Sequence, residues 1–174
     1  MTRREEIAEL LGRLTRLHAA RRRSADLPEA QVAAIDYLAR ANRFSRTPSA
    51  AADYLAATRG TVSQTLLALA RKGLVADEPA PDRRSRIYSL TASGRKAAAC
   101  IPAPASGPDE ELVILAGLRA ALHALIRSGG GRTFGLCRTC RHHRTGPDGA
   151  FCALLKISLT DVEADQICHE HQAA

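Results

Sequence analysis

Four cysteines lie in the last quarter of the chain, in the pattern Cys137-x2-Cys140-x11-Cys152-x15-Cys168. Two residues between the first pair allow a tight turn that directs both sulfurs to one point. Four thiolates in a short segment satisfy the tetrahedral coordination of a metal ion. The segment has few apolar residues, so metal is the expected source of its stability. We therefore expect one metal centre per chain, held by these four cysteines.

The residues leave the identity of the metal open. Zinc is the usual ion of small four-cysteine modules and is favoured. However, zinc modules usually contain two close pairs, and here fifteen residues split the second pair, so an iron–sulfur cluster is the alternative. Nearby histidines could replace a cysteine or support the ligands, although the all-cysteine set is preferred. They are His142, His143, His169 and His171.

The fifth cysteine, Cys100, lies beside a proline-rich break and is expected to be an ordinary buried residue. A cysteine and a histidine can also act as nucleophile and base in an enzyme. No third residue in a recognisable context would orient such a pair, and clustered thiols bind metal more readily than they catalyse. We therefore do not expect an enzyme.

A second group of residues, in the middle of the chain, suits contacts to DNA. Arginine can bond guanine and glutamine can bond adenine through two hydrogen bonds, whereas threonine and serine bond either base. The start of one expected helix carries Arg59, Thr61, Ser63, Gln64 and Thr65. A proline-stiffened turn further along could lie along phosphates or enter the minor groove. It carries Arg83, Arg84 and Arg86.

Helices and a hairpin must position these side chains. Apolar residues recur at helical spacing over residues 3–23 and again from residue 28. Thr47 suits the cap of a third helix, and Thr58 suits the cap of a fourth that Gly73 ends.

Beyond these helices, two apolar runs flank the arginine-rich turn and predict a β-hairpin over residues 74–90. A helix over residues 109–128 is apolar over much of its surface and predicts a partner subunit.

Two short helices followed by a hairpin describe a winged helix-turn-helix. The stretches TPSAAADYLAATRGTVSQTLLALARKGLV and DRRSRIYSLTASGRKA resemble the MarR family of bacterial regulators. The resemblance covers about residues 5–128. By position it makes residues 59–72 the recognition helix and residues 82–86 the wing. It implies a homodimer with interlocked terminal helices that binds an inverted-repeat operator, usually as a repressor. Many members respond to a small ligand, and here a small-molecule effector stays unidentified.

We therefore predict a mainly α, winged-helix (α+β) fold with N- and C-terminal dimerisation helices and a small metal module. Residues 1–131 form the DNA-binding and dimerisation domain, with the helix-turn-helix at about 47–73 and the wing at about 74–90. The dimerisation helix spans about 109–128, and residues 132–174 form the cysteine-rich tail. Because the tail follows that helix directly, we expect coupling to DNA through a shift of the dimerisation helix.

The charge distribution agrees with double-stranded DNA as a partner. The net charge is +7, yet five basic and five acidic residues balance from residue 132 onward. The excess therefore lies in residues 1–131, and a basic body suits a polyanion. A charged N-terminus and the lack of an apolar run of about 18 residues predict a cytoplasmic protein without a membrane span.

The expected function is a sequence-specific DNA-binding transcriptional regulator whose tail is structural or senses metal or redox state. One alternative keeps DNA binding and places a redox-sensing iron–sulfur cluster in the tail. A remoter alternative is a zinc protein that binds RNA or a protein partner, although few aromatic residues are present to stack on bases. The operator, the direction of regulation and the signal stay open.

Overall fold

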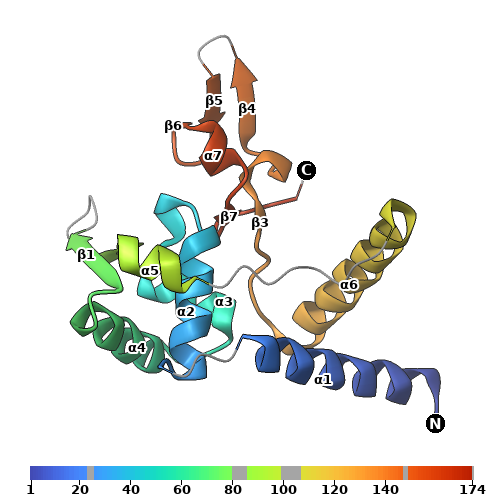
Figure 1. Ribbon diagram of the computed structural model, residues 1–174. Coiled ribbons are helices and arrows are strands. Elements are labelled where there is room, and N and C mark those ends of the chain that lie inside the picture. The colour runs from blue at the N-terminus through green and yellow to red at the C-terminus, as the bar shows by residue number, and fades with distance from the viewer. Residues whose placement is uncertain (23–25, 80–85, 99–106, 147–148, 174) are drawn as a thin grey trace.

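The computed structural model of the 174-residue chain describes residues 1–22, 26–79, 86–98, 107–146 and 149–173. Helices dominate the first three quarters of the chain and short strands the last quarter (Figure 1). The helices are α1 (Arg3–Arg21), α2 (Glu29–Arg40), α3 (Pro48–Leu55), α4 (Arg59–Arg71), α5 (Ala92–Ala97), α6 (Pro108–Gly129) and α7 (Asp161–Ala164). Two 3₁₀ turns are η1 (Arg43–Ser45) and η2 (Cys137–Thr139).

The strands form three small antiparallel sheets. Strands β1 (Val75–Pro79) and β2 (Arg86–Leu90) make the predicted hairpin, in which Val75 pairs with Leu90. In the tail, β3 (Gly135–Leu136) pairs with β7 (Ile167–Cys168). A three-stranded sheet joins β4 (His143–Gly146), β5 (Gly149–Cys152) and β6 (Ile157–Leu159). The sequence did not predict these strands of the tail, because runs of two to four residues show no clear periodicity.

Helix α2 is the centre of the main core. Ile35, Tyr37 and Leu38 are at most 2% exposed, and α3, α4, α5 and β2 all pack on this helix. Helix α4 faces it with an apolar stripe. That stripe is Val62, Leu66 and Leu69. The mainly helical winged-helix fold predicted from the sequence is confirmed.

The ends of α3 and α4 follow the predicted signals. The Thr47 hydroxyl accepts a hydrogen bond from the Ala50 N–H (3.2 Å), and the Thr58 hydroxyl accepts one from the Thr61 N–H (3.1 Å). Such caps satisfy backbone donors that have no partner inside the helix. Gly73 follows α4 with a φ of +68°, a conformation that glycine adopts without strain.

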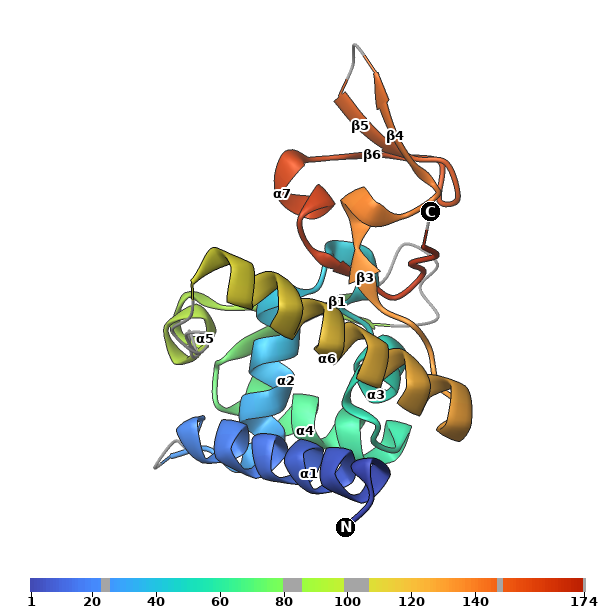
Figure 2. The same cartoon turned by 90° about the vertical axis from the view of Figure 1, so that its right-hand side faces the viewer.

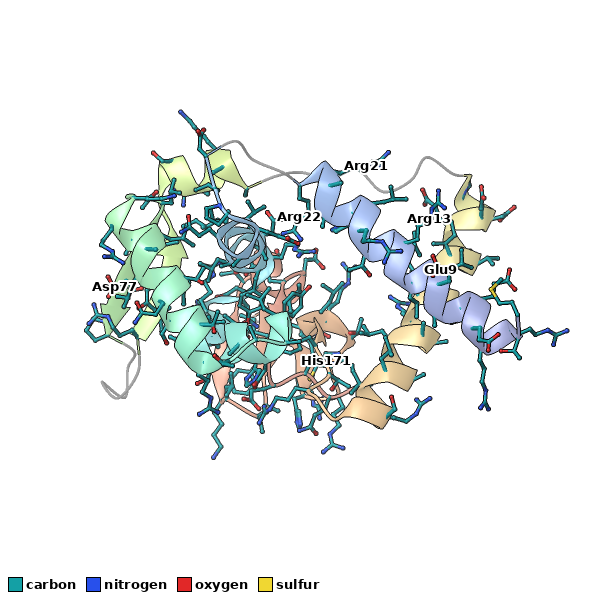
Figure 3. All side chains as sticks on the ribbon, turned by 90° about the horizontal axis from the view of Figure 1, so that it is seen from below. Glu9, Arg13, Arg21, Arg22, Asp77 and His171 are labelled. Atoms are coloured by element: carbon teal, nitrogen blue, oxygen red, sulfur yellow. The ribbon has the colours of Figure 1, made fainter. Side chains whose placement is uncertain are left out.

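Helices α1 and α6 stand beside the main core and bury none of their residues (Figures 1 and 2). On α1 the large apolar residues Ile7, Leu10, Leu14 and Leu17 are 51–55% exposed. Figure 3 shows Arg22, just beyond α1, close to α2, where it forms an ion pair with Asp36. The pair ties the end of α1 to the body.

Helix α6 exposes large apolar side chains over several faces. These are Leu112, Val113, Ile114, Leu115, Leu118, Leu122 and Leu125. Its length and its mean hydropathy of 1.4 are sufficient for a membrane span, whereas the sequence predicted no such span. Length and composition alone are weak support for a span, because a helix that packs on a partner subunit has the same properties.

The glycine of the LTASG segment is required by close packing. A Cβ on Gly94 would lie 2.0 Å from the Leu74 carbonyl oxygen, which is backbone and cannot rotate away. We expect Gly94→Ala to destabilise the protein by about 2 kcal/mol or more, as overpacking of a tight contact does. A thermal unfolding curve measures this. Gly60→Ala is the matched control, because its Cβ would meet only the Thr58 hydroxyl at 3.9 Å. Equal melting temperatures for the two variants would contradict this packing.

Candidate nucleic-acid interface and thiol cluster

The N-terminal turns of α4 present polar side chains to solvent. Arg59, Thr61 and Gln64 are exposed, while Ser63 and Thr65 are half-buried. Opposite them, the apolar stripe of α4 anchors the helix on α2, so the polar face points away from the core. This arrangement leaves the first turns of α4 free to approach another molecule.

Local hydrogen bonds divide these side chains into two groups. The Thr61 hydroxyl lies 2.8 Å from the Thr58 hydroxyl, and the Thr65 hydroxyl donates to the Thr61 carbonyl at 2.9 Å. By contrast, the side chains of Arg59, Ser63 and Gln64 make no hydrogen bond or ion pair within the described part of the chain, and of these Arg59 and Gln64 are exposed. These two side chains are therefore the ones available to reach a ligand without breaking a contact.

Of the three wing arginines, only Arg86 lies among the described residues. It forms an ion pair with Asp77 on the neighbouring strand, and half of its side chain is exposed. This pair lowers its availability to phosphates. Arg83, Arg84 and Cys100 lie outside the described residues.

The four tail cysteines are all buried and are not in disulfides. Their exposed fractions are 4% for Cys137, 8% for Cys140, 7% for Cys152 and 6% for Cys168. The first pair forms the predicted tight turn, in which the Cys140 N–H donates to the Cys137 carbonyl (3.0 Å). Cys152 and Cys168 are brought to the same region at the ends of β5 and β7.

Electrostatics shows that these thiols are neighbours. Burial first, and then repulsion from the other three tail cysteines, raises the pKa of the Cys137 thiol to about 12. Such repulsion is large only between charges close together in a medium of low polarity. The other three tail cysteines therefore lie close enough to Cys137 to act on its thiol.

Hydrogen-bond donors point at the sulfurs. The Gln172 N–H donates to Cys140 Sγ at 3.5 Å. Burial raises the pKa of Cys168, while Asn42, Ser45 and the Glu170 N–H lower it by hydrogen bonding. Asn42 is 1% exposed, and its Nδ2 makes no hydrogen bond of ordinary geometry within the described residues. A thiolate at Cys168 would be the acceptor for this amide.

The donor chemistry fits a metal ion, but the described geometry is not that of a closed site. Among the residues that the structure describes, no three His, Cys, Asp or Glu side chains form a group that could hold an ion. The sulfurs would have to move closer together to share one metal.

The tail histidines differ in their surroundings. His142 and His171 lie near Gln172 and Thr139 respectively. Burial lowers the pKa of His171. His143 sits opposite Cys152 in the β4–β5 pair, and its buried Nε2 has no hydrogen-bond partner within the described residues. His143 is therefore the histidine best placed to support the thiols, a role that the C-x2-C-x2-H spacing indicates.

Sequence reasoning missed Asn42 and Ser45, which lie about 125 positions from Cys168 in the chain. No local pattern in the sequence connects them to a cysteine in the tail. Only the folded chain brings them together.

Residues 25–85 match the model of the MarR family, which ends before α6 and the thiol cluster. No curated protein matches the chain. Among solved structures, the MepR–DNA complex of Staphylococcus aureus has 22% identity and a TM-score of 0.53, with 72% of this chain and 99% of that chain covered. BpsR of Bordetella bronchiseptica has 20% identity and a TM-score of 0.50, covering 67% of this chain and 98% of that one. These structures share the winged-helix fold with this chain.

A third relative widens the range of ligands seen on this fold. PcaV, a transcriptional regulator of Streptomyces coelicolor, has 18% identity and a TM-score of 0.50, covering 71% of this chain and 94% of that one. Its structure holds its natural ligand, and DNA binding by BpsR is regulated by 6-hydroxynicotinic acid. MepR and PcaV are transcriptional regulators, and at these identities the likeness to this chain is one of fold.

The hydroxyl of Tyr37 holds the segment that carries Asn42 and Ser45. It donates to the Ser45 carbonyl at 2.6 Å in the core. We expect Tyr37→Phe to lower the free energy of unfolding by about 1–3 kcal/mol, because a buried carbonyl loses its donor. Tyr54→Phe, in the same ring cluster, is the control and should change stability by less than about 0.5 kcal/mol. Chemical denaturation measures both values, and a stable Tyr37→Phe protein would contradict this role.

Proposed function

We propose that the protein is a sequence-specific DNA-binding transcriptional regulator, a repressor that acts as a homodimer on an inverted-repeat operator. The observation that carries the proposal is the start of α4, on a helix anchored in a winged-helix core. There the side chains of Arg59 and Gln64 are exposed and have no partner among the residues that the structure describes. Arginine and glutamine at this end of a recognition helix suit guanine and adenine in the major groove.

The exposed apolar helices support the homodimer. Helices α1 and α6 together leave a wide apolar surface in water, and soluble monomers rarely expose such an area. A second copy would cover it and would set two recognition helices about 34 Å apart, one turn of DNA. Because its proposed target is DNA, we propose that the protein acts in the cytoplasm.

DNA binding is tested with duplexes selected from a randomised inverted-repeat library. Arg59→Ala should weaken binding by about tenfold to a hundredfold, since a two-bond contact to guanine contributes about 1–3 kcal/mol. Arg71→Ala removes the same charge from the other end of α4 and should have a small effect. Affinity should also fall steeply with salt, because phosphate contacts release counterions. Equal affinities for the wild type and Arg59→Ala would contradict the assignment.

We also propose that the tail cysteines hold one metal centre per chain. The burial of all four thiols, the action of the other three cysteines on Cys137 and the Gln172 N–H that donates to Cys140 Sγ support it. Four thiolates satisfy the tetrahedral coordination of zinc, and an iron–sulfur cluster takes the same ligands.

Metal content is measured on protein purified without oxygen. A colourless protein with one zinc per chain would support zinc, whereas a broad visible absorption band would support iron–sulfur. Cys152→Ser should lose the metal and melt at a lower temperature, because metal binding stabilises so small a core. Cys100→Ser is the control and should keep its metal. Unchanged metal content in Cys152→Ser would refute the four-cysteine site.

A further inference from the structure

The tail packs on the body at a short segment that we call the elbow, residues 41–47, between α2 and α3. Strands β3 and β7 lie over this end of α2, whereas α4 lies at the other side of the body (Figures 1 and 2). The residues on both sides of Cys168 bind the elbow. The Asn42 N–H donates to the Ile167 carbonyl (2.9 Å), and the His169 N–H donates to Ser45 Oγ (2.8 Å).

Charged side chains strengthen this contact at two places. Arg43 Nη1 lies 2.8 Å from Glu163 Oε1, and Arg43 Nη2 donates to the Ser158 carbonyl at 3.1 Å. On α3, Asp53 Oδ2 lies 2.8 Å from His169 Nε2. The tail therefore contacts both the elbow and the first helix of the helix-turn-helix.

Aromatic side chains cross the contact in both directions. Phe44 of the elbow packs into the small tail core with Cys137 and Cys152. Phe134 of the tail packs into the main core, with its ring centre 5.0 Å from that of Tyr54. Because each core contains a ring from the other, a change in packing around the thiols acts directly on the elbow.

The elbow also forms a hydrogen bond with strand β2 of the wing hairpin. The Tyr88 N–H of β2 donates to the Arg46 carbonyl at 2.8 Å, and Arg46 Nε donates to the Ala41 carbonyl at 2.9 Å. The elbow thus lies between the thiol cluster and the hairpin that carries the wing arginines.

Coupling between the thiol cluster and the DNA-binding elements through α6 would be less direct. The joint after α6 contains Gly130 and Gly131, both with positive φ, and α6 itself buries no residue. A flexible glycine joint transmits little force. The structure therefore favours the elbow over the predicted shift of the dimerisation helix.

We propose that the thiol module regulates DNA binding through the elbow. When the four thiolates bind a metal, Cys168 keeps β7 packed on the elbow. This packing holds α3 and the wing in the arrangement that binds DNA. Loss of the metal frees β7, and DNA must then order these elements on binding, which lowers affinity. This inference rests on the proposed function.

The test uses an undocked variant, Arg43→Gln with Asp53→Asn, which removes the charged partners that the elbow and α3 offer to the tail but leaves every cysteine and α4 unchanged. The matched control, Arg138→Gln with Asp165→Asn, removes an exposed ion pair within the tail and the same two charges. Each full-length protein is loaded with Zn²⁺ or stripped with a chelator under reducing conditions. Zinc content, affinity for the selected duplex and hydrogen exchange of the Asn42 and His169 amides are then measured.

We expect the wild type and the control to lose about tenfold or more in DNA affinity on stripping, a usual size for coupling between sites. Exchange at the two amides should become faster at the same time. The loaded undocked variant should keep one zinc per chain, yet bind DNA as weakly and exchange as fast as the stripped wild type.

The outcomes separate the two proposals. Tight DNA binding by the loaded undocked variant, or equal binding by the loaded and stripped wild type, overturns the elbow inference and leaves DNA binding in place. Failure of the loaded wild type to bind any duplex overturns the proposed function, and the inference with it.

Discussion

The burial of α2 is the constraint on which the rest of the structure depends. Ile35, Tyr37 and Leu38 are removed from water almost completely, and this is possible only if other elements cover the helix on several sides. Helices α3, α4 and α5 and strand β2 provide that cover. The positions of helix α4 and the hairpin follow from the need to enclose one apolar helix.

The end of α2 adds a polar requirement to this apolar one. Backbone groups of the elbow cannot continue the helix, and they are buried, so they need partners. Tyr37, Tyr88 and the strand that contains Cys168 supply them. The same few residues therefore close the main core, hold the wing and support the tail.

The two cores differ in how far they can sustain themselves. The main core encloses aromatic and aliphatic side chains from five elements, whereas the tail core consists of Cys137, Cys152 and Leu159 with a few partly buried neighbours. So small a core gains little from removing apolar surface from water. Its packing on the elbow and the metal proposed for its thiols would supply the missing stability.

The sequence by itself determined the helices, their threonine caps and the hairpin, because periodicity, caps and turns are local properties. It also identified the residues that suit DNA and the four clustered cysteines. Only the tertiary structure decided that Asn42, Ser45 and Asp53 face the tail, that Asp77 pairs with Arg86, and that the tail packs on the elbow. These contacts join residues far apart in the chain, and no periodic pattern records which distant backbone groups will satisfy one another.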